Sequence, residues 1–230
     1  MRLLRSVGIG VWRLSERLGI DVMGAVEGPP YAIDDERRRT FDALVAAARA
    51  RDGTIDVAAC PYAVHELLSY LTLERDVLLH GSNDPALDVL EPRPAHDYGT
   101  ELLAVLATDD GIWPLFYAVL DRDRIEGIFT ACTHLGRPPR LRRLYLFAIG
   151  GDPHAAETWT GGVVYVLPRK GFRREWGNEW VSPEPVRPLL RIPVRPDDFP
   201  LRDAVVGLAG EEEFRHVGRH LRAAKRAAAG

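Results

Sequence analysis

The sequence predicts an α+β fold in which helices come first and a mostly antiparallel sheet follows. Before residue 75, apolar residues recur at intervals of three and four, which is the spacing of one helix face. Beyond that point, short apolar runs bounded by turn residues indicate strands. We therefore expect a helical segment over 1–75, packed on a main domain over 76–230.

Three helices are expected in the first segment. The first would present on one face Leu4, Val7, Val11, Leu14 and Leu18, and it could dock on the domain or act as a membrane-surface or targeting helix. The second covers 34–51, because Asp34 or Asp35 can cap its start and Gly53 follows its end. The third begins near Pro61, and its apolar stripe consists of Val64, Leu67, Leu68 and Leu71.

Six strands are expected over 76–80, 102–108, 141–149, 162–167, 179–182 and 186–194. The third and fourth are apolar at consecutive positions, which predicts strands buried on both faces at the centre of a sheet. Pro193 places the last strand at an edge, because proline lacks the N–H that a ladder needs. A short helix presents Trp113, Phe116 and Leu120 on one face, with Pro114 in its first turn. A C-terminal helix over 211–228 begins with acidic residues and ends with basic ones.

Composition excludes several classes of protein. The 230 residues include 30 Lys and Arg against 33 Asp and Glu, so the chain lacks the net positive charge typical of proteins that bind nucleic acid. Cys60 and Cys132 fit no zinc-ligand spacing and indicate a reducing compartment. No apolar run reaches the roughly 18 residues of a membrane-spanning helix. We expect a cytoplasmic protein with no membrane partner, of open oligomeric state.

Common catalytic motifs are absent from the sequence. Gly8 and Gly10 lack the third glycine and the preceding strand of a dinucleotide-binding fingerprint, and neither a hydrolase elbow nor a phosphate-binding loop occurs. His216 and His220, with Glu212, share a helix face that could ligate a metal, but a solvated helix is the favoured interpretation and no metal is expected. A solvated loop is likewise favoured over a phosphate site for Arg137, Arg140, Arg142 and Arg143.

Four segments occur in a characteristic order: LLHGSND at 78–84, VLATDDGIWPLFYA at 105–118, GVVYVLPRKGF at 162–172 and NEWVSPEPVRPLLRIPV at 178–194. Together they resemble the ADP-ribosyltransferase superfamily, in the form found in poly(ADP-ribose) polymerases and rifampin ADP-ribosyltransferase. There one strand ends in His-Gly-Ser/Thr, a second leads into a helix with aromatic residues, and a late strand carries an acidic residue. The resemblance covers about residues 77–195 and implies a split, mostly antiparallel sheet with NAD as substrate.

The resemblance also implies a reaction. ADP-ribosyl transfer breaks the bond between ribose and nicotinamide through an oxocarbenium-like transition state, related to that of glycoside hydrolysis. Glu179 would hold the ribose 2′-hydroxyl and stabilise the developing positive charge, unless it is a solvated surface residue. Glu175 is the competing carboxylate. The products would be an ADP-ribosylated acceptor or, without an acceptor, hydrolysed NAD.

The NAD-binding residues follow from the same resemblance. His80 would hydrogen-bond the ribose, unless it bonds a backbone carbonyl at the end of its strand. Gly81 would let the backbone approach the carboxamide, and Ser82 would supply a hydroxyl. Nicotinamide would stack on Phe116 or Tyr117, with core packing as the alternative for Phe116. The implied binding set is therefore His80, Gly81, Ser82, Thr108, Trp113, Phe116 and Tyr117.

The sequence departs from the family pattern at Val105, where the polymerases have a tyrosine; Trp113 or Tyr98 could supply the missing ring. This departure leaves open a non-catalytic module that binds NAD, ADP-ribose or a protein partner on the same fold. Asp109 and Asp110 are expected to cap the helix that follows them rather than to meet a pyrophosphate. The loops 83–101 and 169–178 do not identify the acceptor, and nucleic acid stays open as one.

Overall fold

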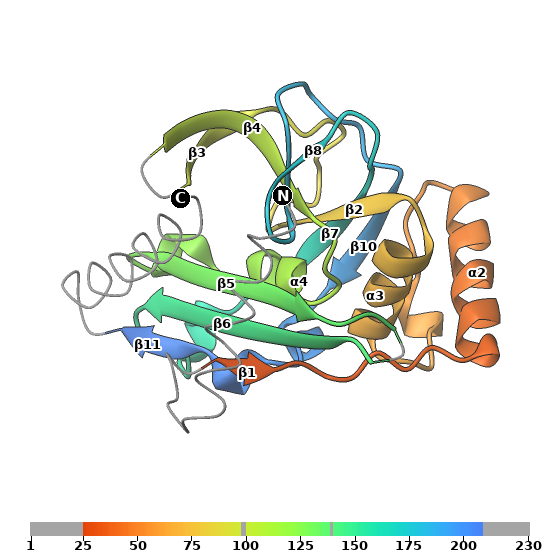
Figure 1. Cartoon of the computed structure of the whole chain (residues 1–230), viewed down its shortest axis with the longest axis horizontal. Helices are drawn as coiled ribbons and strands as arrows, with labels where there is room; N and C mark the ends of the chain where they lie inside the picture. Colours follow the sequence, from red (N-terminus) through yellow and green to blue (C-terminus); the bar gives the residue numbers. More distant parts are fainter. Residues whose placement is uncertain (1–24, 98–99, 139, 209–230) are drawn as a thin grey trace.

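The computed structural model describes residues 25–97, 100–138 and 140–208, which form a mixed α+β fold of two mostly antiparallel sheets and three α-helices. Figure 1 shows the smaller sheet across the lower half of the molecule, with α4 above it and α2 and α3 together at one end. The expected fold class is confirmed at this level.

The helices α2 and α3 confirm two of the predicted helices. Helix α2 spans Asp35–Arg49, and Oδ1 of its N-cap Asp34 accepts a hydrogen bond from the Arg37 amide at 2.9 Å. Helix α3 spans Val64–Glu74. The segment before residue 75 is not helical throughout, because β1 (Val26–Glu27) is a strand and residues 50–63 contain the 3₁₀ turn η1 (Val57–Ala59) and a bridge from Thr54 to Arg191 but no α-helix. The predicted first helix and the predicted helix 211–228, with its two histidines, lie outside the described residues.

The larger sheet is antiparallel at every pairing and has seven strands in the order β10-β7-β2-β4-β9-β8, with β3 paired to β4. Strand β7 lies inside this order, as its apolar run predicts, and Pro193 lies on the outermost strand, β10. The strands are β2 (Val77–Ser82), β3 (Arg93–Asp97), β4 (Thr100–Thr108), β7 (Gly162–Pro168), β8 (Arg173–Trp176), β9 (Glu179–Ser182) and β10 (Leu190–Val194).

The smaller sheet is built around β6 (Arg142–Gly150), the second strand predicted to be central. Strand β5 (Ile128–Leu135) pairs with it antiparallel along its length, whereas β1 and β11 (Val206–Leu208) pair with different halves of it. The pairing of β11 with β6 is parallel. The sequence did not predict β5.

Helix α4 (Trp113–Val119) contacts both sheets and fixes their relative position (Figure 1). On one side it lies directly on the larger sheet, because a Cβ on Gly81 would be 2.0 Å from the Pro114 carbonyl oxygen, and one on Gly162 would be 2.0 Å from that of Ala118. On the other side the centre of the Phe116 ring lies 4.8 Å from the centre of the Phe147 ring in β6. The glycines therefore give α4 its close approach, and the aromatic rings fill the space opposite.

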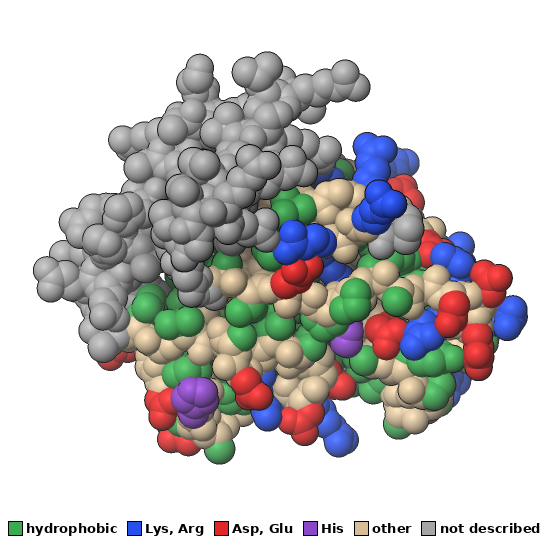
Figure 2. All heavy atoms as spheres, turned by 60° about the horizontal axis from the view of Figure 1, so that its bottom comes forward, with side chains coloured by type: hydrophobic (Ala, Val, Ile, Leu, Met, Phe, Trp, Pro, Cys, Tyr) green, Lys and Arg blue, Asp and Glu red, His purple; other side chains and the backbone are tan. Residues whose placement is uncertain are grey.

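Charged side chains of both signs gather at the right of Figure 2. In this part of the fold, Arg37 of α2 pairs with Glu66 of α3 at 2.6 Å. The four arginines between 137 and 143 do not share one solvated loop, because Arg142 and Arg143 belong to β6. Arg142 pairs with Glu27, whereas Arg143 is buried and donates to Ser69 Oγ at 2.6 Å. None of the helices described is both long and apolar enough to cross a membrane.

Candidate functional site

Three adjacent strands bring Glu179 into a row with the end of β2. Leu79 of β2 lies opposite Thr108 of β4, and Thr108 lies opposite Glu179 of β9. Opposed residues of antiparallel strands point to the same face of a sheet. Leu79 packs in the hydrophobic core that includes α4. Glu179 therefore extends from the face of the sheet on which α4 lies.

His80 follows this row and bridges two strands. The β2–β4 ladder is limited to the pair Leu79 and Thr108, and beyond it the half-buried ring of His80 reaches Leu106, with 2.7 Å between Nδ1 and the carbonyl oxygen. The alternative considered for His80, a bond to a backbone carbonyl, is thus confirmed. Because a carbonyl can only accept, Nδ1 carries the proton and Nε2 keeps its lone pair.

The environment of His80 keeps its ring neutral. Burial lowers the pKa of His80 to about 4, and the positive charges of Arg122 and Arg93 act in the same direction, against the hydrogen bond to Leu106. No described residue hydrogen-bonds Nε2. At neutral pH this nitrogen is therefore a hydrogen-bond acceptor.

Tyr117 on α4 faces the same region as Glu179. Its hydroxyl lies 2.8 Å from Thr130 Oγ1 in β5, which also accepts a 3.0 Å hydrogen bond from Trp113 Nε1. Burial raises the pKa of Tyr117, and the negative charge of Glu179 raises it further, against the hydrogen bond with Thr130. The charge of Glu179 thus acts on Tyr117 through space. The Arg122 guanidinium carbon lies 5.3 Å from the centre of the Tyr117 ring.

A buried carboxylate anchors the start of α4. Oδ1 of Asp110 accepts from the amides of Ile112 and Trp113 at 2.7 and 2.6 Å, and Oδ2 accepts from His134 Nε2 and the Tyr145 hydroxyl, both at 2.7 Å. The predicted capping role of Asp110 is confirmed. Asp110 also joins the start of α4 to β5 through His134 and to β6 through Tyr145. Burial alone would raise the pKa of Asp110, but these donors and the nearby positive charges hold it well below its usual value.

The same network continues to the residue before Glu179. Nδ2 of Asn178 lies 3.1 Å from His134 Nδ1 and 2.7 Å from Asp109 Oδ1, so its two amide hydrogens can serve both acceptors. Asp109 also pairs with Arg174, and it therefore binds a side chain rather than capping the helix. The predicted capping role of Asp109 is wrong. The chain Asp110–His134–Asn178–Asp109 fixes the backbone on which Glu179 is carried.

Asp110, Cys132 and His134 place one ligand atom each within 4.8 Å of the others, a spacing that a metal ion could use. Three observations favour hydrogen bonding instead. His134 Nε2 already donates to Asp110. Burial and the charge of Asp110 raise the pKa of the Cys132 thiol well above its usual value, which disfavours the thiolate. The positive charge of the neighbouring Arg143 would repel a cation.

Several residues predicted to bind NAD have structural roles. Phe116 is fully buried and contacts four other rings, so core packing applies and a ligand ring cannot stack on it. Trp113 is also buried. Ser82 Oγ and Thr108 Oγ1 accept from the amides of Asp84 and Asp110, both at 3.1 Å.

The aromatic side chains at the site also differ from the two stacking rings that the resemblance implies. Val105 is buried in the core on the opposite side of the sheet from Glu179, so a tyrosine at that position would not face Tyr117. Tyr98 lies outside the described residues. The competing carboxylate Glu175 lies on β8, where it pairs with Arg173. Of the two carboxylates, Glu179 is the one whose charge acts on Tyr117.

Sequence reasoning missed Thr130, His134, Asn178 and Arg122. Thr130 and His134 belong to the unpredicted strand β5, and Arg122 begins the 3₁₀ turn η2 (Arg122–Arg124) after α4. Asn178 directly precedes Glu179 within the quoted NEWVS segment, so its position beside the proposed acid was a signal that could have been used.

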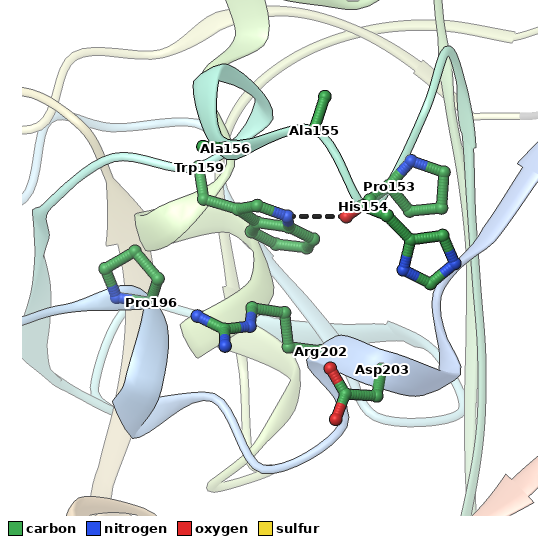
Figure 3. A pocket seen from close by; sticks show the side chains of 8 residues that line it. All are labelled: Pro153, His154, Ala155, Ala156, Trp159, Pro196, Arg202 and Asp203. Carbon is green, nitrogen blue, oxygen red and sulfur yellow. Dashed lines mark hydrogen bonds between the residues drawn. The ribbon is translucent and has the colours of Figure 1, made fainter.

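Two cavities of about 340 Å³ lie away from this site. One is bordered by Trp159, whose Nε1 donates to the Pro153 carbonyl at 2.8 Å, and by Arg202 and Asp203 (Figure 3). The other is lined by Thr54, Asn83, Pro85, Gly161, Gly162, Val163, Arg191 and Pro193. Neither cavity is lined by Glu179 or His80.

Comparisons with known proteins identify no relative of this chain: no family model, no curated protein and no solved structure matches it. A function must therefore be argued from the residues and their geometry.

Proposed function

We propose that this protein transfers ADP-ribose from NAD to an acceptor, or to water, with Glu179 stabilising the charge that develops on the ribose. The observation that carries the proposal is the row Leu79–Thr108–Glu179 across β2, β4 and β9, which puts Glu179 and the residue before His80 on the two strands that flank β4, at the same level of the sheet. The resemblance of residues 77–195 to ADP-ribosyltransferases supports the same pair. The proposal includes the split sheet of that family.

The state of His80 suits contact with a ribose. Its Nδ1–H is bonded to Leu106, and its neutral Nε2 can accept a hydrogen bond from a sugar hydroxyl. A neutral imidazole also adds no positive charge next to an oxocarbenium-like centre. A low pKa is therefore an advantage at this position.

The reaction needs one carboxylate and no general acid. The bond between ribose C1 and the nicotinamide nitrogen breaks, and its electron pair neutralises the positively charged ring, which leaves without a proton. An acceptor hydroxyl or water then forms the new bond to C1 and loses its proton to solvent or to Glu179. A negative charge beside C1 lowers the energy of the transition state more than that of bound NAD. Tyr117, half-buried on the helix that lies on the face of Glu179, offers an aromatic ring for nicotinamide.

Release of nicotinamide from NAD, followed by chromatography, tests the proposal. We expect Glu179→Gln to lower the rate by about 100-fold or more, the scale of a lost electrostatic group. His80→Ala should lower it as well. Glu175→Gln is the matched control, because Glu175 lies on the neighbouring strand in a pair with Arg173, and it should keep the wild-type rate. Equal rates in wild type, E179Q and H80A would contradict the proposal.

A second candidate, a non-catalytic module that binds NAD or ADP-ribose, is favoured by the aromatic side chains. With Val105, Trp113 and Phe116 buried, Tyr117 alone among the predicted rings within the described residues is partly exposed. A single ring holds nicotinamide less firmly than two. Calorimetric binding of NAD without nicotinamide release would support this candidate, whereas wild-type turnover that depends on Glu179 would exclude it.

A further inference from the structure

The outer face of the smaller sheet, turned away from α4, is apolar at its centre. Successive side chains of a strand point to opposite faces, and Tyr145, Phe147 and Ile149 of β6 belong to the core around α4. The opposite face carries apolar residues of β5 and β6: Phe129, Ala131, Leu144, Leu146 and Ala148. An antiparallel sheet with one face in solvent normally presents polar residues there, so this face is suited to packing against another layer.

The centre of this outer face is nearly inaccessible to solvent, although its described apolar contacts lie within the sheet itself. Leu146 is 5% and Ala148 3% exposed. The described apolar residues that pack with them, Phe129, Ala131 and Leu208, belong to the same sheet. Side chains on one face of a sheet stand side by side, so they do not cover one another. The face therefore needs a covering layer beyond the apolar contacts that the described residues provide.

The register of β1 directs the chain that precedes it toward this face. Strand β1 runs antiparallel to β6, with Val26 opposite Tyr145. Because β5 pairs with β6 along its length, β1 and β11 share the other edge of β6, where Val206 lies opposite Ala148. A strand continued backward from Val26 would meet β11 three positions earlier. The core against which Val26 packs fills the inner side, so we expect the preceding chain to leave on the side away from the core.

The other end of the described chain runs away from this face. Strand β11 is parallel to β6, and Leu208 lies opposite Gly150, the last residue of β6. The direction of β11 therefore takes the chain past the end of β6 and away from Leu146. Strand directions favour the segment before β1, rather than the one after β11, as the cover of the outer face.

The segment before β1 contains an apolar stripe of suitable length. The stripe consists of Leu4, Val7, Val11, Leu14 and Leu18 on one face of the helix that the sequence predicts. A helix over 4–18 would be about 22 Å long, and the nine residues of β6 extend about 30 Å. The connection 19–25 can span about 20 Å. The helix can therefore lie across the outer face while its chain stays joined to β1.

We propose that the apolar stripe of residues 4–18 docks on the outer face of the smaller sheet, as the second layer that covers Leu146 and Ala148. This docking decides between the two roles that the sequence leaves open for the predicted helix, because a stripe buried on the sheet is not available to a membrane surface or a targeting receptor. Arg2, Arg5 and Arg13 lie on the opposite side of the predicted helix and would face solvent.

Photo-crosslinking in the full chain tests the docking. The photoreactive residue p-benzoylphenylalanine is placed at Val11, within the stripe, and in a second protein at Ile9, on the opposite side of the predicted helix. After irradiation and digestion, mass spectrometry should join position 11 to peptides of β5 or β6 in the same molecule. Position 9 is the matched control and should give no such product.

Thermal unfolding of Val11→Asp and Ile9→Asp compares the same two sides. A carboxylate at position 11 would be pressed against apolar side chains, so the midpoint should fall by about 5 °C or more, the scale of one lost apolar side chain in a chain of this length. The midpoint of I9D should stay close to wild type, because Asp and Ile have similar helix propensities and position 9 would face solvent. Equal midpoints in the two variants would contradict the docking.

Co-sedimentation with vesicles that contain phosphatidylserine distinguishes docking from membrane binding. We expect the wild-type protein to stay in the supernatant, because its stripe is covered by the sheet. Pelleting of wild type that V11D abolishes would overturn the docking. So would cross-links from position 11 to another element or to a second molecule, or the absence of any cross-link to β5 and β6.

Discussion

Replacing Asp110 with asparagine should destabilise the protein more than any comparable change to a surface aspartate. The buried carboxylate accepts four hydrogen bonds, two at each oxygen. In the variant, Oδ1 can still accept from the amides of Ile112 and Trp113. The amide nitrogen that replaces Oδ2 cannot accept a hydrogen bond, so the Nε2–H of His134 and the O–H of Tyr145 both lose their acceptor.

The size of the loss follows from these contacts. A buried donor that loses its acceptor costs about 1–3 kcal/mol. Two such donors, with removal of the negative charge near the buried Arg143, predict a loss of about 3–5 kcal/mol in the free energy of unfolding. For a chain of this length, about 2–4 °C of Tm corresponds to 1 kcal/mol, so the midpoint should fall by roughly 10 °C.

The contribution of Asp110 to the free energy of unfolding should also change with pH in a defined direction. The folded-state pKa of Asp110 lies well below its usual value because the His134 hydrogen bond and the neighbouring charges outweigh burial. An aspartate in an unfolded chain has a pKa of about 3.9. The stabilisation is therefore complete above that value and is lost as the pH falls through it toward the folded-state pKa. Wild type should lose stability more steeply than D110N between about pH 5 and pH 3.

Chemical denaturation followed by circular dichroism at several pH values measures both effects. Asp56→Asn is the control, because Asp56 is exposed and caps η1 through the Ala58 amide at 3.2 Å, and asparagine caps equally well. The described role of Asp110 would be refuted by a loss below about 1 kcal/mol, the scale of one ordinary hydrogen bond, or by identical pH slopes in the two proteins.

Two further predictions concern the contacts of β2. Gly81→Ala should lower the free energy of unfolding, measured with denaturant, by about 2–3 kcal/mol, because its Cβ would lie 2.0 Å from the Pro114 carbonyl oxygen. The control Gly161→Ala should lower it far less, because the nearest atom to that Cβ is 3.6 Å away. Equal losses in the two variants would contradict the close approach of α4. The ring signals of His80 in NMR, assigned by comparison with H80A, should titrate with a midpoint near pH 4, and a midpoint near the usual value for histidine would show that the ring is not buried as described.

The parts of the fold that the sequence predicted depend on local patterns. The apolar runs of β6 and β7 required strands with both faces buried, and Pro193 required an outer position. Asp34 was recognisable as an N-cap because capping involves residues within one turn. In each case the physical cause lies within a few residues of the element itself.

Strand β5 was not predicted, because the residues on the face that it turns toward α4 are mostly polar. Thr130, Cys132 and His134 occupy every second position and therefore lie on one face. Thr130 hydrogen-bonds to Trp113 and Tyr117, and His134 hydrogen-bonds to Asp110. Polar residues on a buried face remove the apolar signal on which strand prediction depends. The partner of His80 was equally hidden, since it depends on where the β2–β4 ladder stops. Such contacts join distant segments and leave no local pattern.

The position of α4 connects these features. Its first turn is held by Asp110, which joins it to β5 and β6, and its body lies on the bare backbone of Gly81 and Gly162. Asp110 bonds the first turn of this seven-residue helix, and the two glycines meet its backbone at Pro114 and Ala118, so neither constraint can relax without moving the helix. The helix carries Tyr117, whose hydroxyl reaches Thr130, and it is followed by Arg122, whose guanidinium lies over the Tyr117 ring. A substitution at Gly81 should therefore alter ligand binding through α4 even though Gly81 itself contributes no side chain.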